Sequence, residues 1–108
     1  MNDMDKITLD MNDNRIKEVE KYWKDLVPVM VGEEVGELLQ CVSKYERFLK
    51  KVDGDIDYDG SPEESELMNN MEKEIADLFI IIGALIKRYG LDPFSIKIYM
   101  DKKLDKKY

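Results

Sequence analysis

The stretch that decides the fold is Glu72–Ile86, which reads EKEIADLFIIIGALI. From Ile75 onward every residue is apolar or glycine except Asp77. This run is too short to cross a membrane, which takes about 20 apolar residues, and it predicts a buried core helix instead. A carboxylate is costly to bury unless it is paired, hydrogen-bonded or bound to a metal ion. Asp77, with Glu74 one helical turn before it, therefore marks the first candidate site.

Helical signals continue on both sides of this stretch. Ser61 is a favourable N-cap, Pro62 fits the first helical position, and Gly90 is a natural terminator. Caps, prolines and apolar spacing predict four helices, over residues 14–26, 28–51, 62–89 and 93–106. Only the stretch IKIY near the C-terminus has a strand-like pattern, and its caps favour a helix. We therefore expect an all-α fold, an antiparallel bundle of about four helices in a single domain spanning residues 1–108, with residues 1–13 a flexible N-terminus and residues 52–61 an acidic loop.

Composition excludes several classes of function. The chain of 108 residues carries a formal net charge of -7, which argues against binding a nucleic-acid polymer. It has no histidine, which excludes the usual histidine-based zinc sites and triads. The only cysteine, Cys41, is expected to be a small buried hydrophobe, and a single cysteine fits a reducing compartment. The N-terminus shows no secretory signal, so we expect a cytoplasmic protein that does not associate with membranes.

A short internal similarity brings in a second pair of acids. Residues 34–38, EVGEL, and residues 74–78, EIADL, share the pattern acid, β-branched, small, acid, leucine. Residues three apart are neighbours on a helix surface, so Glu34 with Glu37 and Glu74 with Asp77 form two carboxylate pairs. Four such groups converging between antiparallel helices would need a cation, and Mg²⁺, or Mn²⁺ in its place, favours oxygen ligands. The small residues Gly36 and Ala76, between the acids, would admit a close neighbour.

Plainer interpretations compete with this site. An acidic pair on a helix is commonly a solvated face, although the apolar surroundings of Asp77 favour a metal site. The segment Asp55–Glu66 has an EF-hand-like spacing, with Gly60 sixth, but Pro62 interrupts its second half, so a solvated acidic turn is preferred over a calcium loop. An aromatic residue at helical spacing is more often core than a base-stacking group, and we expect Trp23 to be core.

The acidic pattern resembles a known family. The string Glu33-Glu34-x-x-Glu37-Leu38, followed after a loop by Glu74-x-x-Asp77, is similar to the signature of the all-α nucleoside triphosphate pyrophosphohydrolases, the MazG-like group with its dimeric dUTPase and phosphoribosyl-ATP pyrophosphohydrolase relatives. The resemblance covers roughly Pro28 to the C-terminus. It implies an enzyme that cleaves a nucleoside triphosphate between the α- and β-phosphates, giving the monophosphate and pyrophosphate.

The resemblance also implies roles for individual residues. The metal ligands for Mg²⁺ would be Glu34, Glu37, Glu74 and Asp77, with Glu37 or Glu34 polarising the attacking water and Glu33 in the outer shell. The C-terminal stretch DKKLDKK matches a motif on the family's last helix, so it implies phosphate contacts from Lys103, Lys106 and Lys107. Asp101 stands where the motif has asparagine. No residue is assigned to the base.

The expected assembly is a homodimer or homotetramer. The family completes its bundle with a second subunit, and the run LFIIIGALI is apolar all round, which suits a helix covered on every side. The alternative to an enzyme is a helical dimerisation or adaptor domain of the same fold without catalysis. Asp101 and the lysine-only tail favour this alternative.

Overall fold

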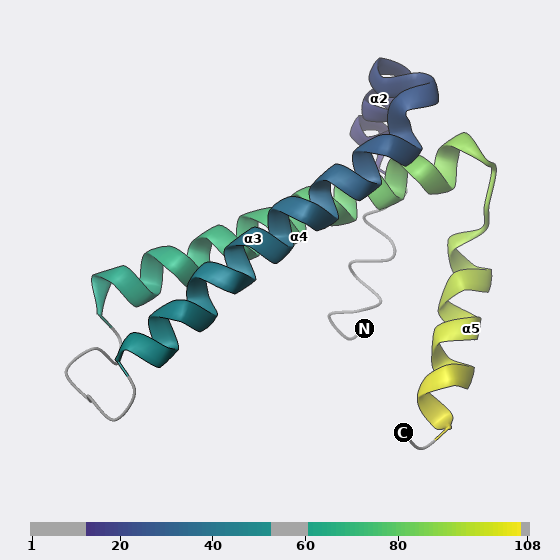
Figure 1. Ribbon diagram of the computed structural model, residues 1–108. Helices are drawn as coiled ribbons and strands as arrows, with labels where there is room; N and C mark the ends of the chain where they lie inside the picture. The colour runs from purple at the N-terminus through teal and green to yellow at the C-terminus, as the bar shows by residue number, and fades with distance from the viewer. Residues whose placement is uncertain (1–12, 53–60, 107–108) are drawn as a thin grey trace. The chain divides into compact units, whose positions relative to one another are not determined.

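The computed structural model describes residues 13–52 and 61–106, and these residues are helical apart from short connections. The elements in chain order are α2 (Asn14–Trp23), the 3₁₀ helix η1 (Lys24–Leu26), α3 (Val27–Lys51), α4 (Pro62–Arg88) and α5 (Pro93–Asp105) (Figure 1). No strand occurs in the described part of the chain, so the expected all-α class is confirmed. None of its helices is long and apolar enough to cross a membrane. The structure divides into two compact units, Met1–Pro28 with Ile80–Tyr108, and Val29–Phe79.

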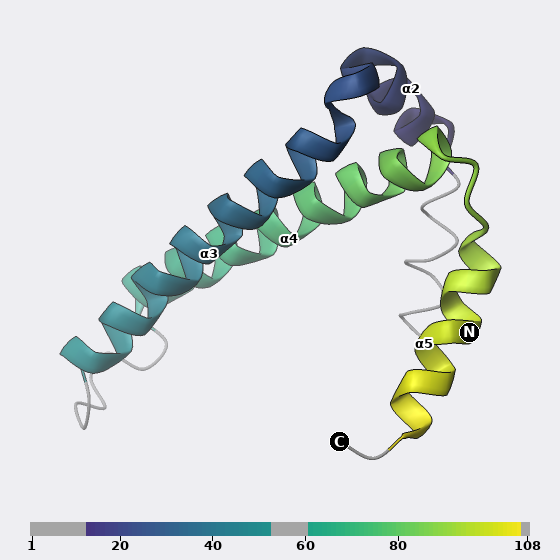
Figure 2. The same ribbon diagram turned by 45° about the vertical axis from the view of Figure 1, so that its right-hand side comes forward.

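The unit Val29–Phe79 is a helical hairpin built from most of α3 and the first two-thirds of α4. Glu34, early in α3, lies near Glu74, late in this part of α4. Phe48, late in α3, lines the same hollow as Leu67, early in α4. The two helices therefore run antiparallel and side by side, as both views show (Figures 1 and 2). The antiparallel pairing of these two helices agrees with the antiparallel arrangement that was expected.

The hairpin buries little on its own. Phe48 is 4% exposed and stacks on Tyr45 with ring centroids 6.3 Å apart. Cys41, expected to be buried, is only partly buried. Several large apolar side chains of the hairpin remain exposed, namely Val29, Val35, Leu39, Leu49, Met68, Ile75 and Phe79. A two-helix layer has one covered face at most, so this exposure follows from the architecture of the hairpin.

The other unit packs α2 against the last turns of α4. Its core contains Ile16, Ile81, Ala84 and Ile86, each 9% exposed or less. At the centre of this packing, a Cβ added to Gly83 would lie 3.0 Å from Cγ2 of Ile16. The absence of a side chain at this position therefore allows α2 and α4 to approach closely.

The helix ends follow local sequence signals. At the start of α4 the backbone N–H of Glu64 donates to Oγ of Ser61 over 3.1 Å, as an N-cap requires. At the end of α4 Gly90 has a φ of 64°, and the N–H of Leu91 donates to the carbonyl of Ile86 over 2.9 Å. This arrangement is a Schellman motif, which ends a helix with a left-handed residue. Asp92 then caps α5 by accepting from the N–H of Phe94 over 3.0 Å.

The first predicted helix was wrong at its C-terminal end. The α-helix stops at Trp23, and Lys24 adopts a φ of 49° before η1 begins. Arg88, the last residue of α4, forms ion pairs with both Glu20 on α2 and Asp25 on η1. Trp23, expected in the core, is partly buried and meets Tyr22 edge to face with ring centroids 5.0 Å apart. Tertiary contacts have overridden the helical spacing of this segment.

Candidate metal centre

Three acidic side chains meet on the hairpin. Carboxylate oxygens of Glu34, Glu37 and Glu74 all lie within 4.8 Å of one another. Glu34 and Glu37 are one turn apart on α3, so their side chains point to the same side of that helix. Antiparallel pairing with α4 then brings Glu74 to the same place. We call these three residues the carboxylate cluster.

Two oxygens of the carboxylate cluster are buried without a partner. Oε2 of Glu34 and Oε2 of Glu74 are shielded from solvent, and neither has a hydrogen-bond partner among the described residues. An unpaired buried carboxylate oxygen is unfavourable, because it has lost its water and gained nothing in return. These two oxygens therefore have hydrogen-bonding capacity that the described residues leave unused.

The electrostatics of the cluster agree with its geometry. Burial raises the pKa of Glu34 above its ordinary value, and the nearby charges of Glu37, Asp77 and Glu74 raise it further. Burial is also the main cause of the raised pKa of Glu74, followed by the proximity of Glu37. Each shift shows that the charged form is disfavoured in the folded chain. A cation at this place would reverse that penalty.

Asp77 occupies a different position from the one expected. Its side chain is exposed rather than buried among apolar residues, and its neighbours Ile75 and Phe79 are themselves 39% and 36% exposed. Within the hairpin this part of α4 has only α3 beside it, so the apolar sequence does not enclose the aspartate. Asp77 does not join the three oxygens of the carboxylate cluster, although its charge helps to raise the pKa of Glu34 and of Glu74.

The remaining predicted site residues lie outside the cluster. Glu33 is exposed, one position before Glu34 on α3. Lys103 on α5 and Lys106 just after it are both exposed, and they belong to the unit that does not contain the cluster. Lys107 lies outside the described residues. Asp101 pairs with Lys97 on the same helix over 3.1 Å.

Two further expectations have partial outcomes. Gly36 was expected to admit a close neighbour, but apart from its two chain neighbours and the adjacent backbone of its own helix, no described atom lies within 4 Å of where its Cβ would be. Ala76 is exposed as well. The first half of the calcium loop considered for Asp55–Glu66 falls outside the described residues, and its last position, Glu66, is within α4.

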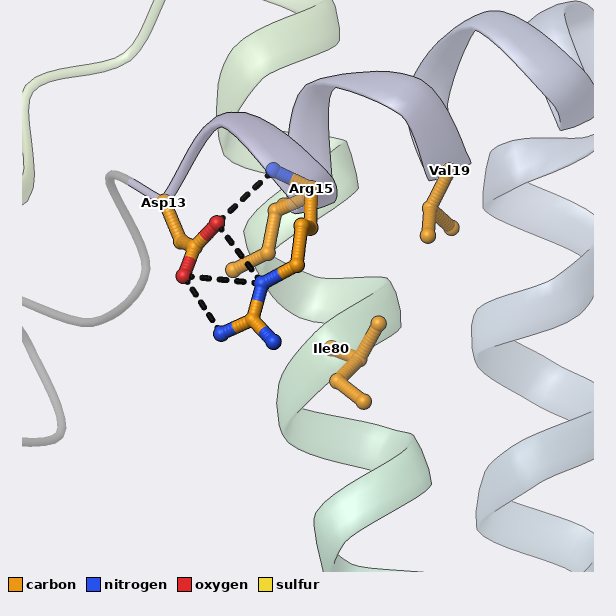
Figure 3. A pocket seen from close by; sticks show the side chains of 5 residues that line it. Asp13, Arg15, Val19 and Ile80 are labelled. Atoms are coloured by element: carbon orange, nitrogen blue, oxygen red, sulfur yellow. Dashed lines mark hydrogen bonds and ion pairs between the residues drawn. The ribbon is translucent and has the colours of Figure 1, made fainter.

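Another hollow lies in the unit that contains α2. It has a volume of about 470 Å³ and is lined by Asp13, Arg15, Ile16, Val19 and Ile80. Figure 3 shows Asp13 and Arg15 turned toward each other, with Nη2 of Arg15 donating to Oδ2 of Asp13 over 2.7 Å. The two charges offset each other, and hydrogen bonds from Arg15 lower the pKa of Asp13 to about 2. This hollow offers an ion pair and apolar walls, without the converging oxygens of the carboxylate cluster.

A set of cations on α3 was not singled out from the sequence. Lys44, Arg47 and Lys51 line a hollow of about 280 Å³ together with Phe48, Glu63 and Leu67. Their spacing of three and four residues places them on one side of the helix. That spacing is visible in the sequence as Lys44, Arg47 and Lys51. We call Lys44, Arg47 and Lys51 the basic row.

The donor set of the carboxylate cluster suits a hard divalent cation. Its three residues supply only carboxylate oxygens, which Mg²⁺ and Mn²⁺ prefer over softer ligands. The two unpartnered buried oxygens would become ligand atoms, and the raised pKa values show why a positive charge would be favourable there.

Comparison with protein-family models, with curated proteins and with solved structures finds no match to this chain.

Proposed function

We propose that this protein is a Mg²⁺-dependent nucleoside triphosphate pyrophosphohydrolase of the MazG-like, all-α group. The observation that carries the proposal is the meeting of Glu34, Glu37 and Glu74 with two of their oxygens buried and unpartnered. The resemblance of the acidic pattern to that group supplies the reaction. Mg²⁺ in such sites is typically held by a few carboxylates together with the phosphates of the substrate.

The residues present fit the metal that this function requires. Glu34, Glu37 and Glu74 would hold Mg²⁺, and Asp77 would add negative charge beside them. A bound Mg²⁺ would neutralise charge on the phosphates and lower the pKa of a bound water. The carboxylates otherwise repel one another, so the site is poised to bind a cation rather than an anion alone.

The chemistry of the chain's own residues is proton transfer and positioning. Attack of water on the α-phosphorus forms one P–O bond while the bond to the bridging oxygen breaks, and pyrophosphate leaves with that electron pair. The proton of the water passes to a carboxylate oxygen of Glu37 or Glu34. Glu37 is the more exposed of the two, so its carboxylate is the more accessible base.

We also propose that the enzyme is a homo-oligomer. Val35 and Leu39 on α3, and Ile75 and Phe79 on α4, are apolar side chains exposed at helical spacings, with Leu39 59% exposed. An apolar surface of this kind on a two-helix layer favours a second layer. Pairing of two hairpins into a four-helix bundle would cover it, which gives the proposed homodimer or homotetramer.

Hydrolysis of a nucleotide panel tests this function. Purified protein is incubated with ribo- and deoxynucleoside triphosphates and Mg²⁺, and we expect monophosphate and pyrophosphate in equal amounts from at least one of them. Glu74→Gln should lower kcat/KM by 100-fold or more, because it removes a charged ligand. The matched control is Glu72→Gln, an exposed glutamate on the same helix, which should retain activity. Failure of the wild type to turn over any nucleotide would refute the proposal.

A non-catalytic dimerisation or adaptor domain is the second candidate. The ion pair between Asp101 and Lys97 favours it, because that carboxylate is already engaged on its own helix. Titration calorimetry separates the two candidates. An adaptor should release no heat with Mg²⁺ or with a non-hydrolysable nucleotide, whereas the enzyme should bind both.

A further inference from the structure

The basic row lies on the same helix as two members of the carboxylate cluster. Glu37 and Lys44 are seven residues apart on α3, which is two helical turns, so they lie on nearly the same side. At a rise of about 1.5 Å per residue, their Cα atoms are about 10 Å apart along the axis. Helical side chains lean toward the N-terminus, so Lys44 leans toward Glu37. The face that carries the cluster thus continues into a positively charged surface.

The three cations of the basic row are unpaired in the part of the chain that is described. Lys44, Arg47 and Lys51 are exposed, and none forms an ion pair there, although Glu63 shares their hollow. No acid stands three or four residues before or after any of them within α3. Some other cations of the described chain are paired, as Arg88 is with Glu20 and Lys97 is with Asp101.

Ordinary structural reasons do not account for the whole row. Cations in the last turn of a helix complement its dipole, and this explains Lys51. The effect is lost beyond the last turn, so it does not explain Lys44. Like charges three and four residues apart repel, and the row contains both spacings. A row that is unfavourable by itself and has no acidic partner suits an external anion.

The polar surroundings of the row suit phosphate. Lys44 and Arg47 also line a second hollow of about 410 Å³, together with Gln40 and Ser43, whose side chains carry hydrogen-bond donors. Arginine binds phosphate through two parallel hydrogen bonds, and lysine binds it as a point charge. A carboxylate site for a metal ion next to a row of cations suits a ligand with several linked phosphates. The metal ion would bind the phosphates at one end of this ligand, and the cations would bind those at the other end.

We propose that the basic row binds the terminal phosphates of a polyphosphate-bearing ligand. This proposal rests on the function proposed above, in which the terminal phosphates are the β- and γ-phosphates of the nucleotide. The basic row would then hold these two phosphates as they leave together as pyrophosphate. Lys44 is the residue next to the carboxylate cluster, Arg47 adds a bidentate contact, and Lys51 extends the row toward the end of α3. The nucleoside lies on the other side of the scissile bond.

Binding of inorganic triphosphate with Mg²⁺, followed by calorimetry, tests the row without requiring turnover. Lys44→Ala and Arg47→Ala should each weaken binding about tenfold. Lys50→Ala is the matched control, because it removes one charge from the same helix but lines neither hollow. It should change the affinity less than threefold. Absence of triphosphate binding to the wild type, or equal weakening by all three variants, would overturn the proposal.

Product inhibition separates this proposal from the function on which it rests. In the active enzyme, Lys44→Ala should raise the inhibition constant of pyrophosphate about tenfold and leave that of the nucleoside monophosphate unchanged. A variant that only loosened the helix would raise both. Hydrolysis with an unchanged pyrophosphate constant would overturn the role of the row and leave the function standing. Triphosphate binding that depends on Lys44, in a protein that hydrolyses no nucleotide, would support the role of the row and refute the proposed function.

Discussion

Replacing Glu34 by glutamine should stabilise the metal-free protein. Glu34 has one buried, unpartnered oxygen and is surrounded by the charges of Glu37, Glu74 and Asp77. Glutamine keeps the shape of the side chain and removes its charge. The substitution should therefore relieve repulsion that the folded chain bears and the unfolded chain does not.

The magnitude follows from the number of like charges. Each close pair of like charges on helices costs a few tenths of a kcal/mol, and Glu34 faces three of them, so the gain is about 1 kcal/mol after solvent screening. For a chain of this length that gain corresponds to a rise in Tm of about 4 °C. The effect should diminish as the pH falls below 4.5, the ordinary pKa of Glu34, because the carboxyl group of Glu34 then becomes protonated in both the folded and the unfolded chain.

Thermal unfolding at fixed protein concentration, in a chelator at pH 7.5, measures this effect. The control is Glu46→Gln on the same helix, whose side chain is exposed and outside the cluster, and its Tm should match the wild type. Adding Mg²⁺ at about 100 times its Kd should stabilise the wild type by about 2.7 kcal/mol, and Glu34→Gln by far less. A metal-free Tm of Glu34→Gln at or below that of the wild type would refute the reasoning.

Three further predictions concern pH and packing. The raised pKa values of Glu34 and Glu74 contribute stability that is complete below their ordinary value of 4.5 and is lost as the pH rises through the folded-state pKa. Urea unfolding without metal should therefore show a free energy of unfolding that falls from pH 4.5 toward neutrality. A rise over that range would contradict this prediction. Gly83→Ala should lower the free energy of unfolding by about 1–3 kcal/mol, because the new Cβ would lie 3.0 Å from Cγ2 of Ile16. At Gly32 a new Cβ would point into open space, so Gly32→Ala should leave the free energy of unfolding unchanged or raise it by up to about 1 kcal/mol. Chemical denaturation of both variants decides this, and equal effects would exclude the close packing. Ser61→Ala should cost about 1 kcal/mol in the same measurement, because the N–H of Glu64 loses its cap, and an unchanged midpoint would show that the cap is dispensable.

Helix ends were predictable where a short-range signal decides the backbone. Ser61, Gly90 and Asp92 each act on residues two to five positions away, through hydrogen bonds that the sequence itself specifies. The pairing of α3 with α4 agrees with the antiparallel arrangement expected from the apolar patterns of two long helices. The meeting of Glu34, Glu37 and Glu74 followed from that pairing and from helical spacing.

The features that were missed depend on distant parts of the chain. Lys24 leaves the helical conformation although neither glycine nor proline marks the place, and the contacts made by Arg88 are far away in sequence. Asp77 lies in an apolar run, yet its exposure is decided by how many helices surround that run. Sequence periodicity reports which residues are apolar and leaves open which of them are covered.

The carboxylate cluster also affects the rate at which this chain folds. Glu34 and Glu37 lie early in α3, and Glu74 lies well beyond the start of α4, so the acids meet when the two helices pair along their length. The barrier to that step therefore includes repulsion between like charges, which dissolved ions screen. Refolding of the hairpin should accelerate as ionic strength increases, so the ions of the surrounding solution act on this protein before it is fully folded.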